Sequence, residues 1–92
     1  MELIAHRLNK IIELKKLPRK YGAEIDLRTS GSNIILHHDA QKKGEKLENY
    51  LSNYRHGTLI LNIKDSGIEK DVIKIVKKFH IKNFFLLDVE LP

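Results

Sequence analysis

Strand-like runs alternate with segments of helical periodicity along this chain, and this alternation limits the possible folds more than any other feature. The strand-like runs fall at residues 3–5, 23–28, 58–64 and 84–88. The clearest helix is predicted over residues 68–79, where apolar side chains repeat at helical spacing: Ile68, Val72, Ile75, Val76 and Phe79. Strands that alternate with helices are typical of βαβ units, so the sequence predicts an α/β fold with a parallel sheet.

Turn and capping residues set the expected ends of these elements. Asn9 is expected to cap the first helix and Pro18 to end it, and Gly57 marks the end of the second helix. The turn cluster at residues 30–33, Ser-Gly-Ser-Asn, is so short that the strands on either side can pair as a hairpin instead of lying parallel. Residues 41–46 are polar and are expected to form a loop.

Length and composition narrow the class of protein. The 92 residues are enough for one domain over positions 1–92. The net charge of +5 favours anionic partners, such as phosphate esters, nucleic acid or acidic membrane surfaces, unless the scattered lysines only solvate helix faces. The chain has no cysteine, which excludes disulfides and thiolate metal sites. It shows no signal-peptide pattern and no apolar run of about 20 residues, so we expect a cytoplasmic protein without membrane insertion.

Polar side chains gather where the predicted strands end. His6 and Arg7 follow the first strand, and Glu24 and Asp26 lie late in the second. Pairs of polar residues take the same place in the later strands: His38 and Asp39, Asn62 and Lys64, and Asp88 and Glu90. The carboxyl ends of parallel strands carry the active site in α/β proteins. Because side chains two residues apart on a strand point the same way, these groups can project into one space.

This set of side chains suits phosphodiester chemistry. Glu24 and Asp26 repel each other, and a cation that prefers oxygen ligands, Mg²⁺ or Ca²⁺, removes that repulsion. Two histidines can act as general base and general acid near neutral pH. Arg7 and Lys64 can bind a phosphate and stabilise the charge that builds on it.

The order of these motifs resembles that of the glycerophosphodiester phosphodiesterases, in the superfamily that includes the phosphatidylinositol-specific phospholipases C. The matching segments are His6-Arg7, Glu24-Ile25-Asp26, Leu36-His37-His38-Asp39 and Asn62-Ile63-Lys64. The resemblance implies the N-terminal half of a TIM-barrel-like (β/α) barrel, a parallel half-barrel of about four principal strands plus a possible hairpin strand. It also implies a metal-dependent phosphodiester hydrolase that acts on a small phosphodiester.

The resemblance implies a role for each matched residue. His6 and His38 would be the catalytic acid and base, with His37 structural. Arg7 and Lys64 would bind the substrate phosphate. The metal, Mg²⁺ or Ca²⁺, would be held by three residues: Glu24, Asp26 and Asn62. Asp88 and Glu90 have no counterpart in the family motifs.

Two differences from the family pattern leave an alternative open. Leu8 stands where the family has Gly, and Asn62 stands where it has an acidic ligand. The alternative is a degenerate, non-catalytic barrel half that binds a phosphorylated ligand or a protein partner. A nucleic-acid-binding domain ranks lower, because the chain has no recognition motif. An open half-barrel leaves unpaired strand edges, so the sequence also predicts a homo-oligomer or a missing C-terminal half.

Overall fold

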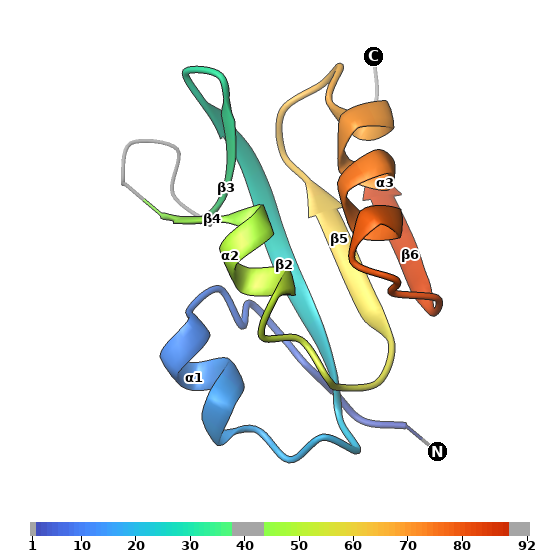
Figure 1. Ribbon diagram of the computed structural model, residues 1–92. Coiled ribbons are helices and arrows are strands. Elements are labelled where there is room, and N and C mark those ends of the chain that lie inside the picture. The colour runs from blue at the N-terminus through green and yellow to red at the C-terminus, as the bar shows by residue number, and fades with distance from the viewer. Residues whose placement is uncertain (1, 38–43, 89–92) are drawn as a thin grey trace.

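The computed structural model describes residues 2–37 and 44–88. This part of the chain forms six strands and three helices (Figure 1). The strands are β1 (Ile4–Ala5), β2 (Gly22–Ser30), β3 (Asn33–Leu36), β4 (Glu45–Lys46), β5 (Leu59–Ile63) and β6 (Phe84–Asp88). The helices are α1 (Ile11–Lys16), α2 (Leu47–Leu51) and α3 (Glu69–Lys78).

All six strands belong to one sheet. Five of them lie in the order β4-β3-β2-β5-β6, and β1 pairs with β2 outside this path. β1 pairs in parallel with the first two residues of β2, β2 pairs in parallel with β5, and β5 pairs in parallel with β6. The β2–β3 and β3–β4 pairs are antiparallel. Because β5 takes one edge of β2 along residues 23–27, β1 and β3 share the other edge, β1 early and β3 late.

The predicted parallel half-barrel is wrong, because the sheet is mixed. Beyond Asp26, β2 continues for four residues and folds back on β3 as a hairpin, the second of the two arrangements that the sequence allows. Gly31 makes this possible, since its φ of 60° lies in the left-handed region that a two-residue turn requires. A hairpin replaces the helical crossover that a (β/α) barrel needs at this point.

One face of the sheet carries the core and all three helices. α2 and α3 lie in front of the sheet in Figure 1. Fully buried side chains come from every helix and from the central strands: Leu14, Ala23, Ile25, Leu27, Leu47, Tyr50, Leu51, Leu59, Leu61, Ile63, Val72 and Val76. Each large aliphatic side chain in this set stabilises the fold by about 1.5–3 kcal/mol.

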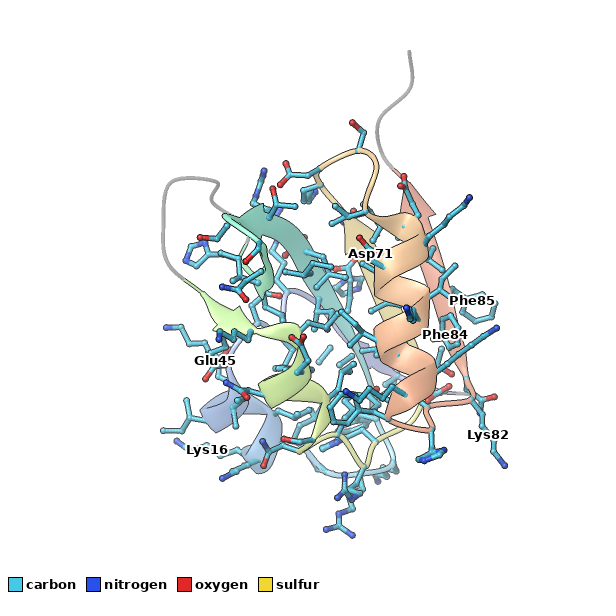
Figure 2. All side chains as sticks on the ribbon, turned by 45° about the horizontal axis from the view of Figure 1, so that its top comes forward. Lys16, Glu45, Asp71, Lys82, Phe84 and Phe85 are labelled. Atoms are coloured by element: carbon cyan, nitrogen blue, oxygen red, sulfur yellow. The ribbon has the colours of Figure 1, made fainter. Side chains whose placement is uncertain are left out.

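The opposite face of the sheet presents the alternate residues of the same strands. In parallel pairing, residues opposite each other point to the same side, and the register pairs Asp26 with Asn62 and Asn62 with Leu87. We call this side the open face and define it by six residues: Glu24, Asp26, Ile60, Asn62, Phe85 and Leu87. Phe85 and Leu87 are 64% and 46% exposed, and Figure 2 shows Phe85 pointing outward from β6.

The predicted helix over residues 68–79 agrees with α3, and α1 ends at Lys16, just before Pro18, as expected. The other two predicted helix ends differ from expectation. α2 ends at Leu51, well before Gly57. Lys10, not Asn9, is the N-cap of α1, and the free N–H of Ile11 is satisfied by the carboxylate of Glu45. Glu45 itself lies in β4, within the segment predicted as a loop. None of the helices in the described chain is long and apolar enough to cross a membrane.

Candidate functional site

His6 and Glu24 form a hydrogen-bonded pair on the open face. The distance from His6 Nδ1 to Glu24 Oε1 is 3.0 Å, and the imidazole is 76% exposed while the carboxylate is 15% exposed. A carboxylate can only accept a hydrogen bond, so Nδ1 carries the proton in this contact. In the neutral ring Nε2 is then an acceptor, and it has no partner among the described residues. Glu24 therefore orients His6 as a base that faces solvent.

Asp26 lies one position further along the same face and is almost completely buried. Its carboxylate is 1% exposed and accepts a hydrogen bond from Asn9 Nδ2 at 2.9 Å. The Asn9 Oδ1 atom accepts the backbone N–H of Asp26 at 2.8 Å. Asn9 thus fills the gap on the β2 edge after β1 ends, while the N–H of His37 binds the Asp26 carbonyl from the β3 side. The two hydrogen bonds between Asn9 and Asp26 explain how a carboxylate is tolerated at a buried position.

Lys64 and Asn62 complete the surroundings of Asp26. The Lys64 Nζ atom is 3.8 Å from Asp26 Oδ1, and the lysine side chain is 22% exposed. Asn62 is the partner of Asp26 in the β2–β5 register. Its Oδ1 atom is buried and has no hydrogen-bond partner in the described structure. A buried amide oxygen without a donor is costly, so this atom is free to accept a ligand.

The His6-Arg7 turn is held by two hydrogen bonds of the Leu8 backbone, one through its N–H and one through its carbonyl. Arg7 has a φ of 53°, in the left-handed region. The N–H of Leu8 binds the Glu24 carbonyl at 2.9 Å, and the Leu8 carbonyl accepts the Tyr50 hydroxyl at 2.7 Å. Burial raises the pKa of Tyr50, so its hydroxyl stays a donor. Leu8, the residue that differs from the family pattern, is partly buried and packs against the core.

The structure brings together several of the residues predicted from sequence. It joins His6 to Glu24 and Lys64 to Asp26, and it places Asn62 beside Asp26. Arg7 is exposed and forms no ion pair with the other described residues.

The remaining candidates are placed less completely. The predicted catalytic His38 lies outside the described residues, as do Asp39 and Glu90, whereas Asp88 ends β6. Glu24 and Asp26 lie within β2 on the open face, not at its carboxyl end, because the hairpin extends the strand to Ser30.

The sequence singles out Asn9 only as a helix cap and not as a residue of this site. Its side chain contacts a residue 17 positions away, and the only local signal, a polar residue before a helix, indicates a cap. The contact between Asn9 and Asp26 follows only from the path of the chain after β1.

The oxygen atoms around Asp26 are of the kind that a hard cation prefers as ligands. Within residues 2–37 and 44–88, no three His, Cys, Asp or Glu side chains are grouped closely enough to hold a metal. A cation here would instead be held by the carboxylates of Glu24 and Asp26 with the orphaned Oδ1 of Asn62. Mg²⁺ is commonly bound in this way, through one or two carboxylates, with waters and substrate phosphate as the other ligands.

Comparison of the chain with family models, with curated proteins and with solved structures finds no match. The resemblance to the glycerophosphodiester phosphodiesterases therefore rests on the motif residues alone.

Proposed function

We propose that the open face binds and cleaves a phosphodiester. The observation that carries the proposal is the exposed His6, oriented by Glu24, on the same face as the Asp26–Lys64 pair. A base held in position by a carboxylate and a cationic side chain beside it are two of the parts that phosphodiester cleavage needs.

The first step is attack by a hydroxyl of the substrate next to the phosphate. His6 Nε2 takes the proton of that hydroxyl, and the oxygen forms a bond to phosphorus. The bond from phosphorus to the leaving oxygen then breaks, and the leaving alkoxide takes a proton from an acid, for which the sequence proposes His38. Water opens the resulting cyclic phosphate with the two roles exchanged.

Charge on the phosphoryl oxygens is balanced by the cationic side chains of the site. Lys64 reaches the open face next to Asp26, and Arg7 follows directly after His6 in the chain. Mg²⁺ or Ca²⁺ held by Glu24, Asp26 and Asn62 would add positive charge at the phosphate. Glu24 uses Oε1 for His6, which leaves its second oxygen available to the cation.

We propose the cytoplasm as the location of the protein.

Ligand binding gives the first test of this proposal. Mg²⁺ and inorganic phosphate are added separately and together, and the melting temperature is followed, because a ligand of the native state raises it. Phosphate bound alone draws Lys64 away from the buried carboxylate of Asp26. Mg²⁺ bound alone is repelled by the positive charge of Lys64. We therefore expect a larger shift from the two together than the sum of the separate shifts, and this excess should vanish in Asp26→Asn.

Turnover gives the second test. With a glycerophosphodiester and Mg²⁺ or Ca²⁺, His6→Ala should lower turnover by roughly 10²–10⁴-fold. Glu24→Gln keeps a hydrogen-bond acceptor without the charge and should cost less, and Lys70→Ala on the exposed side of α3 is the matched surface control. Full turnover in His6→Ala would rule out the mechanism. Cooperative Mg²⁺ and phosphate binding without any turnover would instead support the alternative of a non-catalytic phosphate-binding protein.

A protein partner is the second candidate function, and the apolar residues of the open face favour it. Phe85 and Leu87 are 64% and 46% exposed on β6, which is one of the edge strands of the sheet that the described residues form. Exposed apolar side chains on an unpaired edge favour association with another chain. We propose that this edge associates with a second copy of the chain, which the sequence also predicts as a homo-oligomer.

A further inference from the structure

Two hollows lie side by side at the end of the molecule where each helix ends and the chain leads into the next strand. One has a volume of about 650 Å³ and the other about 510 Å³. Both are lined by Ser52, Arg55 and His56, so they adjoin at these residues. Their walls come from the connections that follow α1, α2 and α3 and lead into β2, β5 and β6. This end is opposite the carboxyl ends of the parallel strands and separate from the site on the open face.

The lining of these hollows is strongly basic, and we call this region the basic end. It is defined by six exposed cations: Lys15, Lys16, Arg19, Arg55, Lys78 and Lys82. No Asp or Glu is found among the residues of the described chain that line the hollows. The ion pairs between described residues use other cations: His6, Arg28 and Lys64. Within the described residues, therefore, no carboxylate forms an ion pair with a cation of the basic end.

One carboxylate lies near the rim but is already engaged. Glu2 approaches Gly57 closely, and it accepts hydrogen bonds of 2.6 Å from both the backbone N–H and the hydroxyl of Thr58. The hydrogen bond from the Thr58 hydroxyl, followed by that from its N–H, lowers the pKa of Glu2. Glu2 thus serves to hold the start of β5 and forms no ion pair with the cations of the basic end.

Helix ends account for only half of these cations. Lys15 and Lys16 lie in the last turn of α1, and Lys78 lies in the last turn of α3, where positive charge complements the helix dipole. Arg19, Arg55 and Lys82 lie outside the helices and gain nothing from a dipole in this way. Their gathering around the same hollows points to an external anion.

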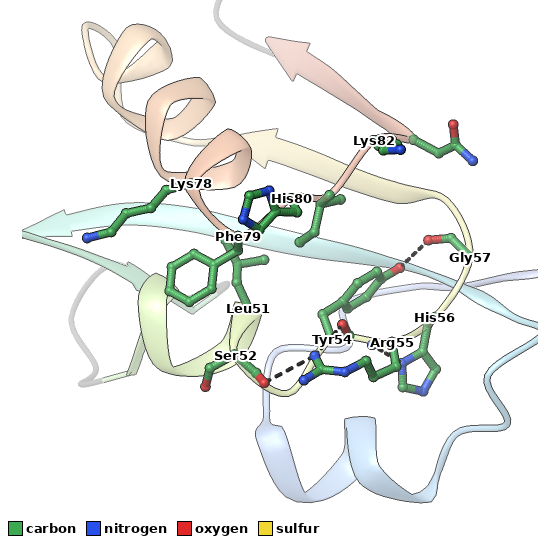
Figure 3. A pocket seen from close by; sticks show the side chains of 12 residues that line it. Leu51, Ser52, Tyr54, Arg55, His56, Gly57, Lys78, Phe79, His80 and Lys82 are labelled. Atoms are coloured by element: carbon green, nitrogen blue, oxygen red, sulfur yellow. Dashed lines mark hydrogen bonds between the residues drawn. The ribbon is translucent and has the colours of Figure 1, made fainter.

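The centre of the basic end is fixed by hydrogen bonds. Arg55 Nη1 donates to the carbonyls of Ser52 and Tyr54 at 3.2 Å and 2.9 Å, and the Arg55 N–H donates to His56 Nδ1. Because Nδ1 accepts, Nε2 of the His56 ring carries the proton and donates to the Leu17 carbonyl at 2.8 Å. Figure 3 shows Arg55 and His56 on one wall of the larger hollow, with Phe79 and His80 across from them. A guanidinium fixed in this way loses little freedom when it binds an anion.

We propose that the basic end is a binding site for a compact ligand that carries several phosphate groups. Cations from three separate connections face two adjoining concave spaces, and this arrangement suits several negative charges held close together. The site is independent of the proposed catalytic function.

Larger anionic partners fit the basic end less well. Single-stranded nucleic acid is usually bound by exposed aromatic rings between the cations, but Tyr54 is buried and Phe79 is half-buried. A membrane surface calls for exposed apolar side chains beside the cations. The large apolar residues that are exposed in the described chain do not line these hollows: Leu3, Ile12, Phe85 and Leu87.

The test is titration calorimetry of the full chain with inorganic tripolyphosphate in 0.15 M NaCl. The double variant Arg19→Ala/Lys82→Ala removes two cations of the basic end whose side chains form no ion pair with the other described residues. Its matched control, Lys46→Ala/Lys70→Ala, removes the same charge from exposed positions elsewhere. We expect the first pair to weaken binding at least about tenfold and the control to change it by less than about twofold.

Four outcomes would overturn the proposal. The first is an absence of tripolyphosphate binding, and the second is equal weakening by both double variants, which would indicate a general charge effect. The third is loss of binding in Lys64→Ala, which would place the anion on the open face. The fourth is a larger loss of binding in Arg19→Ala/Lys82→Ala for a single-stranded oligonucleotide or for phosphatidylserine vesicles than for tripolyphosphate. That result would assign the basic end to a macromolecular partner.

Discussion

Replacing Asn9 by Ala should destabilise the fold far more than its place before a short helix suggests. The substitution removes both hydrogen bonds to Asp26 and leaves a buried backbone N–H without an acceptor. An unpaired buried donor costs about 1–3 kcal/mol, and a hydrogen bond to a charged acceptor contributes about 1.5–3 kcal/mol. Because Asn9 is half-buried and water can replace part of what is lost, we expect a net loss of about 2–4 kcal/mol.

Urea and thermal unfolding followed by far-ultraviolet circular dichroism measure this loss. For a domain of this size the expected change lowers Tm by roughly 10–25 °C, with an unchanged m-value if the transition stays two-state. The matched control is Asn53→Ala, which removes an asparagine whose contacts are exposed and local, and should cost less than about 0.5 kcal/mol. If the two variants are equally stable, Asn9 does not supply the missing part of the β2 edge, and its hydrogen bonds are not what stabilises the buried Asp26.

Three further predictions concern other contacts. The hydrogen bond from the Thr29 backbone N–H, followed by that from its hydroxyl, holds the pKa of Asp65 below its usual value. The stability this gives is present above pH 4 and is lost as the pH falls through the lowered pKa, so Asp65→Asn should cost about 1 kcal/mol at pH 7. The difference from the native chain should shrink below pH 4 in acid titrations of Tm. Tyr50→Phe removes a buried hydroxyl from its carbonyl acceptor and should cost about 1–2 kcal/mol in urea unfolding. Light scattering at micromolar concentration should show association of the native chain that Phe85→Ser/Leu87→Ser abolishes, and a monomeric native chain would contradict it.

Local patterns in the sequence predict the elements whose stability depends on local pattern. The apolar stripe of α3 and the short apolar strands β5 and β6 are found where periodicity places them, because burial of one face requires that spacing. The two-residue spacing of Glu24 and Asp26 likewise puts both on one face of β2. The direction of β3 was not determined by such a pattern. It depends on whether the chain turns back at Gly31, and a strand-like run reads the same in either direction.

Contacts between distant parts of the chain explain the rest. The sequence pattern predicts Asn9 as a helix cap. In the structure β1 ends after two residues, and Asn9 instead pairs with the edge of β2 that β1 leaves open. The N-terminus of α1 is then completed by Glu45, which is 34 residues away from Ile11. Neither relation has a signal in the spacing of nearby residues, so no local rule could have found it.

The charges of the open face connect its stability with its proposed chemistry. A carboxylate as buried as that of Asp26 is tolerated because Asn9 donates to it and Lys64 lies 3.8 Å from it. The same lysine is the group proposed to meet a phosphate, and the same carboxylate is proposed to meet a cation. If Lys64 bound a phosphate alone, or Asp26 bound a cation alone, the other member of the pair would be left as an uncompensated charge in or near the sheet. A cation and a phosphate that arrive together exchange one neutralised pair for two, which favours binding of a metal with its phosphate substrate over binding of either one.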